Sequence, residues 1–190
     1  MKKKFKISFN APVVLGFALA CLIALILGFV SGGFLTDLLF ATRRSSLLSP
    51  LTYLRLFTHV LGHSGWEHFI GNMAYILLLG PMLEEKYGSQ KVIEVILITA
   101  FVAAVVNTVL FPTIVLCGAS GVVFAFILMT SFTSFKEGEI PLSFILVAVI
   151  YLGKEIVDGI FIQDNVSNLS HILGGIVGGV VGYIHNKKRS

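Results

Sequence analysis

The chain has 190 residues, of which 56% are hydrophobic and only 13% are charged, and its mean hydropathy is +0.92. An average soluble domain carries about 25% charged residues, so this composition excludes an ordinary water-soluble protein and predicts a membrane protein. The net charge of +4 comes largely from short basic clusters at the two ends. Such clusters beside apolar segments are topology signals, so we expect no nucleic-acid partner.

The length allows one compact domain over residues 1–190, without a separate soluble module. The first apolar run, residues 12–30, suits an uncleaved spanning helix better than the shorter core of a cleaved signal peptide. The two cysteines, Cys21 and Cys117, have neither CxxC nor metal-ligand spacing. We therefore expect no disulfide framework, no metal site and no cofactor.

Six apolar segments are long enough to be considered as spanning helices. Backbone groups in lipid must be paired internally, and no barrel-like alternation is visible, so we predict an all-α membrane bundle. The connection over residues 31–66 is long and apolar, and we expect it to lie in the outer interface, packed on the helices. The predicted helices are residues 12–30, 67–84, 91–110, 119–135, 140–157 and 167–185.

Six spans place both termini on one side of the membrane. That side would hold the basic flanks 1–11 and 186–190 together with Lys86, Lys91 and Lys136. The positive-inside rule therefore puts both termini in the cytoplasm. The short Lys-rich start, without an Arg- and Ser-rich transit segment, favours a bacterial plasma membrane.

Polar residues inside predicted spans invite a functional interpretation, because burying them in lipid is costly. The fourth span opens with Gly118-Ala119-Ser120-Gly121, and the sixth carries His171. Ser120 precedes Lys136 by sixteen residues, and His171 precedes Lys187 by the same number. At about 1.5 Å per residue, both lie about 24 Å above the inner boundary, roughly 6 Å below the outer surface of a 30 Å core.

His68 reaches a similar depth, sixteen residues before Glu84, and Asn72 follows one turn deeper on the same face. A serine hydroxyl becomes a nucleophile when a neighbouring imidazole takes its proton. Peptide hydrolysis also needs donors for the oxyanion, which His68, Asn72 and the Ser120 amide could supply. Small residues at Gly121, Gly174 and Gly178 would let the two helices approach closely.

These motifs resemble those of the rhomboid intramembrane serine proteases. Gly118-Ala119-Ser120-Gly121 looks like the GxSG motif, and His68-Phe69-Ile70-Gly71-Asn72 resembles the HxxxN motif. His171 followed by Gly174 resembles the histidine motif of the sixth helix. The order and spacing match over about residues 50–185, so the resemblance covers most of the chain.

The resemblance implies a rhomboid-like bundle with a Ser120–His171 dyad and an oxyanion site of His68, Asn72 and the Ser120 amide. The implied substrate is a transmembrane segment that enters near the fifth helix and is cut near its outer end. Arg55 and Glu84 would act as structural braces, and Gly118, Gly121 and Gly174 as packing residues. Phe124 departs from the family pattern, in which many members place a tyrosine beneath the histidine.

Other interpretations stay open at this point. Ser120 could be a helix cap and His171 a packing histidine, and His59 and His63 could be metal ligands, although loop packing is favoured because no third ligand is evident. Asp164 could complete a triad, although a surface-loop aspartate is the simpler assignment. At the level of the whole protein, the alternatives are a non-proteolytic relative that binds transmembrane helices, or a small transporter.

Overall fold

The computed structural model describes residues 8–132, 140, 142–143, 145–147, 149–150, 153 and 165–187. The described chain is helical, as predicted. Half of the predicted fifth span, residues 140–157, and Asp164 lie outside the described residues. The helices are α1 (Pro12–Val30), α2 (Phe34–Leu39), α3 (Pro50–Thr58), the 3-10 turn η1 (His59–Leu61), α4 (Trp66–Tyr87), α5 (Ser89–Leu110), α6 (Ser120–Ser131) and α8 (Asn165–Lys187).

The bounds of four helices lie within a few residues of the prediction, namely α1, α4, α5 and α8. Helix α6 ends at Ser131, which is earlier than the predicted residue 135. Among the described helices, α1 and α5 are both long and apolar enough to cross a membrane, whereas Ser120–Ser131 and Leu169–Ile184 are shorter apolar helices. The described helices thus support membrane character without establishing six spans.

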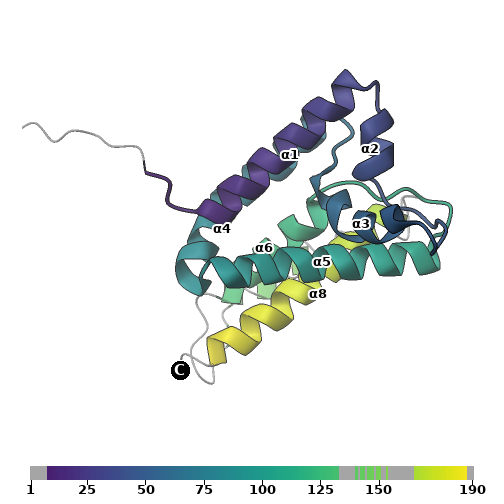
Figure 1. Ribbon diagram of the computed structural model, residues 1–190. Helices are drawn as coiled ribbons and strands as arrows, with labels where there is room; N and C mark the ends of the chain where they lie inside the picture. The colour runs from purple at the N-terminus through teal and green to yellow at the C-terminus, as the bar shows by residue number, and fades with distance from the viewer. Residues whose placement is uncertain are drawn as a thin grey trace, which may run out of the picture.

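Helix α6 is the centre of the bundle. It contacts α4, α5 and α8, and every residue from Gly121 to Met129 is buried. A helix that is apolar on all sides belongs in a protein interior, because no face of it favours water. Figure 1 shows α1 beside α4, and α5 and α8 running past α6. Ser120 therefore begins a helix that is held in place by contacts with α4, α5 and α8.

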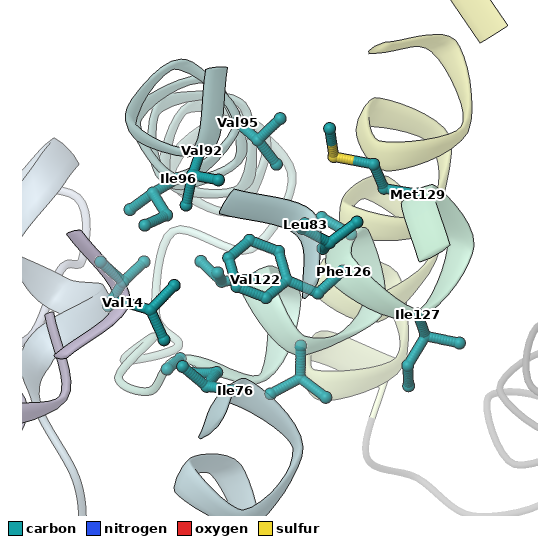
Figure 2. Close-up of a cluster of buried hydrophobic side chains, with 14 of the residues drawn as sticks. Val14, Ile76, Leu83, Val92, Val95, Ile96, Val122, Phe126, Ile127 and Met129 are labelled. Carbon is teal, nitrogen blue, oxygen red and sulfur yellow. The ribbon is translucent and has the colours of Figure 1, made fainter. Parts of the chain in front are cut away.

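The core below Ser120 is built from α1, α4, α5 and α6. Figure 2 shows the Phe126 ring among Val14, Ile76, Leu83 and Val122, and all five side chains are fully buried. At Gly80 an added Cβ would lie 2.7 Å from a Val14 methyl group, so α1 and α4 approach more closely than a larger residue would allow. This packing holds α4 and α6 in a fixed relation.

The segment 31–66 contains more regular structure than the expected interfacial loop. It forms α2, α3 and η1, and α3 begins with Pro50, whose fixed φ suits the first helical position. The segment does pack on the bundle, since the Phe57 ring stacks on Phe101 of α5 at 5.8 Å. Leu48 is 95% exposed, which fits an outer interface better than water.

The start of α1 and the end of α8 lie at the same end of the bundle (Figure 1). At that end the Glu84 carboxylate accepts hydrogen bonds of 3.0 Å from the backbone amides of Val13 and Val14. Ser89 donates a third hydrogen bond to it at 2.6 Å. The carboxylate therefore caps the first turn of α1, where amides have no partner within the helix.

Candidate active site

Ser120 is the first residue of α6 and is partly exposed. The loop before it is tied down at two places. Thr42 and Leu116 exchange two backbone hydrogen bonds of 2.9 and 2.8 Å, and the Gly118 amide donates to the His59 carbonyl at 3.0 Å. The position of the Ser120 hydroxyl is thus set by the segment 31–66 as well as by α6.

Gly118 brings His68 of α4 against this loop. Its φ is +136°, a region that L side chains rarely adopt, and an added Cβ would lie 2.8 Å from His68 Nε2. Only glycine accommodates both the backbone conformation and the adjacent imidazole. The first glycine of the Gly118-Ala119-Ser120-Gly121 motif therefore places the His68 ring beside the start of α6.

Glycines also determine how α6 meets α8. An added Cβ on Gly174 would overlap the Gly121 carbonyl oxygen and lie 2.7 Å from its carbon. One turn further along both helices, a Cβ on Gly178 would overlap the Ala125 carbonyl in the same way. The two backbones are in direct contact, as small residues permit between membrane helices. This register places Ser120, which precedes Gly121, and His171, three residues before Gly174, at the same end of the contact between the two helices.

His171 lies flat on Phe124. The two ring centroids are 4.4 Å apart, and the ring planes differ by 3°. Phe124 follows Ser120 by four residues, so the two side chains share one face of α6. The His171 imidazole therefore lies on the face of α6 that begins with Ser120, with its ring orientation set by the aromatic surface beneath it.

His68 and Asn72 share a face of α4, one turn apart. Ser64 Oγ lies 3.2 Å from His68 Nδ1, and when that hydroxyl donates, His68 Nε2 carries the ring proton and can itself donate. Asn72 is 7% exposed, and its Nδ2 has no hydrogen-bond partner among the residues that the structure describes. A buried amide donor of this kind favours an acceptor that is brought by a ligand.

A small cavity adjoins Ser120 on the side of α5. It measures about 10 Å³, and its polar lining includes Ser120, His59, Thr99 and Ser170. Thr99 Oγ1 has no hydrogen-bond partner within the described ranges. The cavity volume is at the lower limit for one water molecule, and the lining is polar enough to hold one. The sequence interpretation missed this cavity, although Thr99 is a polar residue within an otherwise apolar span and could have signalled it.

His59, in η1, and His63, in the loop after it, are buried, at 1% and 3% exposure. Burial lowers the pKa of each to about 4, so both imidazoles are neutral at pH 7. Their Nδ1 atoms lie 3.2 and 3.1 Å from the carbonyl oxygens of Arg55 and Leu61, which can only accept, so each Nδ1 carries the proton. In the described residues, no three His, Cys, Asp or Glu side chains gather as metal ligands.

Glu84 lies at the end of the bundle where α1 starts, whereas Arg55 lies in α3, one turn before His59, whose carbonyl accepts the Gly118 amide. Arg55 Nε donates to the Leu38 carbonyl at 2.7 Å and so joins α3 to the end of α2. Glu84 is 5% exposed and joins α4 to α1, as described above. Their contacts are those of braces between helices, because each bonds backbone groups from another segment.

Comparison with known proteins identifies the family to which this chain belongs. A sequence model described as the Rhomboid domain matches residues 50–188, which is well over half of the chain. The chain therefore belongs to the rhomboid family, a family of integral membrane proteins.

Several named relatives come from distant organisms. Rhomboid-related protein 2 of Mus musculus is 30% identical over 158 residues, which cover 72% of this chain and 52% of the mouse protein. Rhomboid protease GlpG of Haemophilus influenzae is 26% identical, with 71% of each chain covered. RHOMBOID-like protein 7 of Arabidopsis thaliana is 24% identical, with 69% of this chain and 43% of the plant protein covered. The match thus spans about half the length of the mouse and plant relatives.

Proposed function

We propose that this protein is an intramembrane serine endopeptidase that cuts transmembrane segments near the outer membrane face, with Ser120 as nucleophile and His171 as general base. One observation carries the proposal: the His171 ring stacks on Phe124, four residues after Ser120 on the same face of α6. The backbone contact of Gly174 with Gly121 supports it, because it keeps α8 at this register. The name of the Haemophilus influenzae relative, a rhomboid protease, agrees with this class of chemistry.

In the proposed reaction, Ser120 Oγ attacks the carbonyl carbon of the scissile peptide while the His171 imidazole takes the hydroxyl proton. The tetrahedral intermediate then expels the amine, which receives that proton from His171, and an acyl-enzyme remains on Ser120. Water next attacks the ester, again giving its proton to His171. The proton returns to Ser120 Oγ as the carboxylic acid product leaves.

The oxyanion of each intermediate needs donors that are in place beforehand, and one such donor contributes about 10²–10³ in rate. We assign this role to the Ser120 amide, the Asn72 side chain and His68. The Ser120 amide lies in the first turn of α6, where no intrahelical acceptor exists. Asn72 Nδ2, which has no partner among the described residues, and the contact of His68 with Gly118 support the other two assignments.

The membrane arrangement is part of the proposal. We infer six spans with both termini in the cytoplasm, a bacterial plasma membrane as the location, and entry of the substrate beside the span 140–157. The charge pattern supports the orientation. The gathering of the start of α1 and the end of α8 at one end of the bundle agrees with it (Figure 1).

The test is labelling with a serine-reactive fluorophosphonate, combined with cleavage of a transmembrane peptide in liposomes. Wild type should be labelled and should cut the peptide, whereas Ser120→Ala and His171→Ala should do neither. Ser131→Ala is the matched control, since Ser131 lies at the other end of α6 and bonds the Ile127 carbonyl. Undiminished labelling of Ser120→Ala would refute the assignment. Capture of the peptide by wild type without labelling or cleavage would favour the non-proteolytic alternative.

A further inference from the structure

A pocket of about 430 Å³ lies between α1, α2 and the loops that precede α4 and α6. This volume is within the range of small-ligand sites. The chain reverses direction here at Gly32 and Gly33, whose φ values are +61° and +92°, and the Gly33 amide donates to the Gly28 carbonyl at 2.8 Å. Because these three residues line the pocket without side chains, the reversal leaves it open.

The pocket shares a wall with the candidate active site. Its lining includes His63, Ser64 and Cys117. Ser64 lies within hydrogen-bond distance of His68, and the His63 ring meets the His68 ring edge-on at 5.0 Å. Cys117 directly precedes Gly118, three residues before Ser120. The pocket thus lies beside the His68 ring and the loop that leads to Ser120.

The described lining of the pocket carries a negative charge and no positive one. Asp37 of α2 is exposed, and among the described residues of the lining it is the single carboxylate, with no lysine or arginine beside it. His63 is neutral at pH 7, because burial lowers its pKa to about 4. Burial and the nearby Asp37 charge raise the pKa of the Cys117 thiol to about 12, so Cys117 is neutral too. A ligand in this pocket would therefore meet a net negative charge.

His63 contributes a buried acceptor to the wall of this pocket. Its Nδ1 donates to the Leu61 carbonyl, so Nε2 is left with a lone pair. His63 is 3% exposed, and Nε2 has no hydrogen-bond partner within the part of the chain that the structure describes. The exposed Asp37 carboxylate is therefore the acceptor that a ligand can reach, and it matches a group that only donates, such as an ammonium or guanidinium.

We propose that this pocket binds a lysine or arginine side chain of the substrate, close to the bond that is cut, and that Asp37 determines this preference. The proposal rests on the proposed protease function and names a class of substrate for it. Leu25, Phe29 and Val115 supply apolar walls for the methylene stem, while Asp37 takes the charged head. The substrate would thus carry a basic residue just outside, or at the outer end of, its transmembrane segment.

The test uses a panel of transmembrane peptides in which Lys, Gln or Glu is placed in turn at each position within about five residues of the cut. Wild type should prefer Lys to Glu at one position by at least about tenfold in kcat/KM, since Lys can donate a charge-assisted hydrogen bond to Asp37 and Glu is repelled by it. Asp37→Asn should bring that ratio close to one, and Asp37→Lys should invert it. Glu67→Gln is the matched control, because Glu67 is exposed near His68 but does not line the pocket.

The outcomes separate the two proposals. Cleavage that depends on Ser120 but shows the same Lys-to-Glu ratio in wild type, Asp37→Asn and Asp37→Lys overturns the pocket assignment alone. A ratio that changes equally in Glu67→Gln also overturns it, because the effect would then be a general one of surface charge. Absence of both cleavage and fluorophosphonate labelling in wild type overturns the protease function, and the substrate pocket with it.

Discussion

The rings of Phe124 and His171 are stacked, with their centroids 4.4 Å apart and their planes inclined by 3°. This relationship joins α6 to α8 at the level where Ser120 begins its helix. An imidazole that must accept a proton and then deliver it has to keep its orientation between the two steps. A flat aromatic surface limits its rotation, and a hydroxyl on that ring is not needed for the stacking.

Replacement of the Phe124 ring tests this function. In Phe124→Leu we expect stability to fall by about 1–2 kcal/mol, because an apolar side chain remains in the site. Activity should fall more, by roughly tenfold to a hundredfold, since His171 loses the surface that orients it. Cleavage assays and unfolding titrations would measure the two effects separately. Phe126→Leu is the control, and a similar loss of kcat in that variant would contradict a special role for Phe124.

The close approach of α6 and α8 predicts that Gly174→Ala will disrupt the bundle. The added methyl group would overlap the Gly121 carbonyl oxygen, which belongs to a backbone that cannot move aside easily. We expect a loss of about 1–3 kcal/mol or more, together with loss of fluorophosphonate labelling. Gly179→Ala on the same helix is the control, because its Cβ would make an ordinary contact of 3.7 Å with Phe132. Equal stability of the two variants would argue against the backbone contact.

The Glu84 carboxylate predicts a purely structural phenotype. In Glu84→Gln, the side-chain amide would bring an N–H group to a place where three donors already converge, from Val13, Val14 and Ser89. We expect unfolding to become easier by about 1–3 kcal/mol, while the folded fraction keeps its labelling rate. Glu85→Gln, an exposed neighbour, should change neither quantity. A variant that keeps wild-type stability would show that the cap on α1 is dispensable.

The buried histidines predict that the protein loses stability in mild acid. His59 and His63 have a folded-state pKa of about 4, compared with 6.5 when exposed. Between these values the unfolded chain takes up protons that the folded chain does not, so the free energy of unfolding falls as the pH drops from 6.5 to 4. Each group contributes on the order of 3 kcal/mol to this loss, which levels off below pH 4.

Unfolding measured at pH 7, 5.5 and 4 in detergent would show this slope. His59→Gln should be less stable than wild type at pH 7, because packing around the ring is lost, but it should lose less stability between pH 7 and pH 4. An unchanged slope in that variant would mean that His59 does not remain neutral in the folded protein.

Local sequence patterns were sufficient to predict much of this fold. The bounds of α1, α4, α5 and α8 follow from the lengths of apolar runs, because a helix in lipid must pair its own backbone groups. The rhomboid family was also predicted from motif order alone and is confirmed by the match over residues 50–188. The site residues are conspicuous in sequence, because polar groups in apolar segments are costly and therefore few.

Features that depend on contacts between distant segments needed the tertiary structure. The sequence predicted a loop at 31–66, but α2 and α3 form there because they pack on one another, α2 also on α1 and α3 also on α5. The bridge joins Thr42 to Leu116, and the pocket beside Asp37 is lined by several separate segments. These segments are distant in sequence, so the hydrophobic periodicity within one segment could not predict their contact.

By itself, the sequence determined the approximate bounds of α1, α4, α5 and α8, since these depend on the lengths of the apolar runs. The tertiary structure alone decided which face each helix presents. It set His171 on Phe124 and His68 on Gly118, because those contacts require the close approach of backbones that only packed glycines allow.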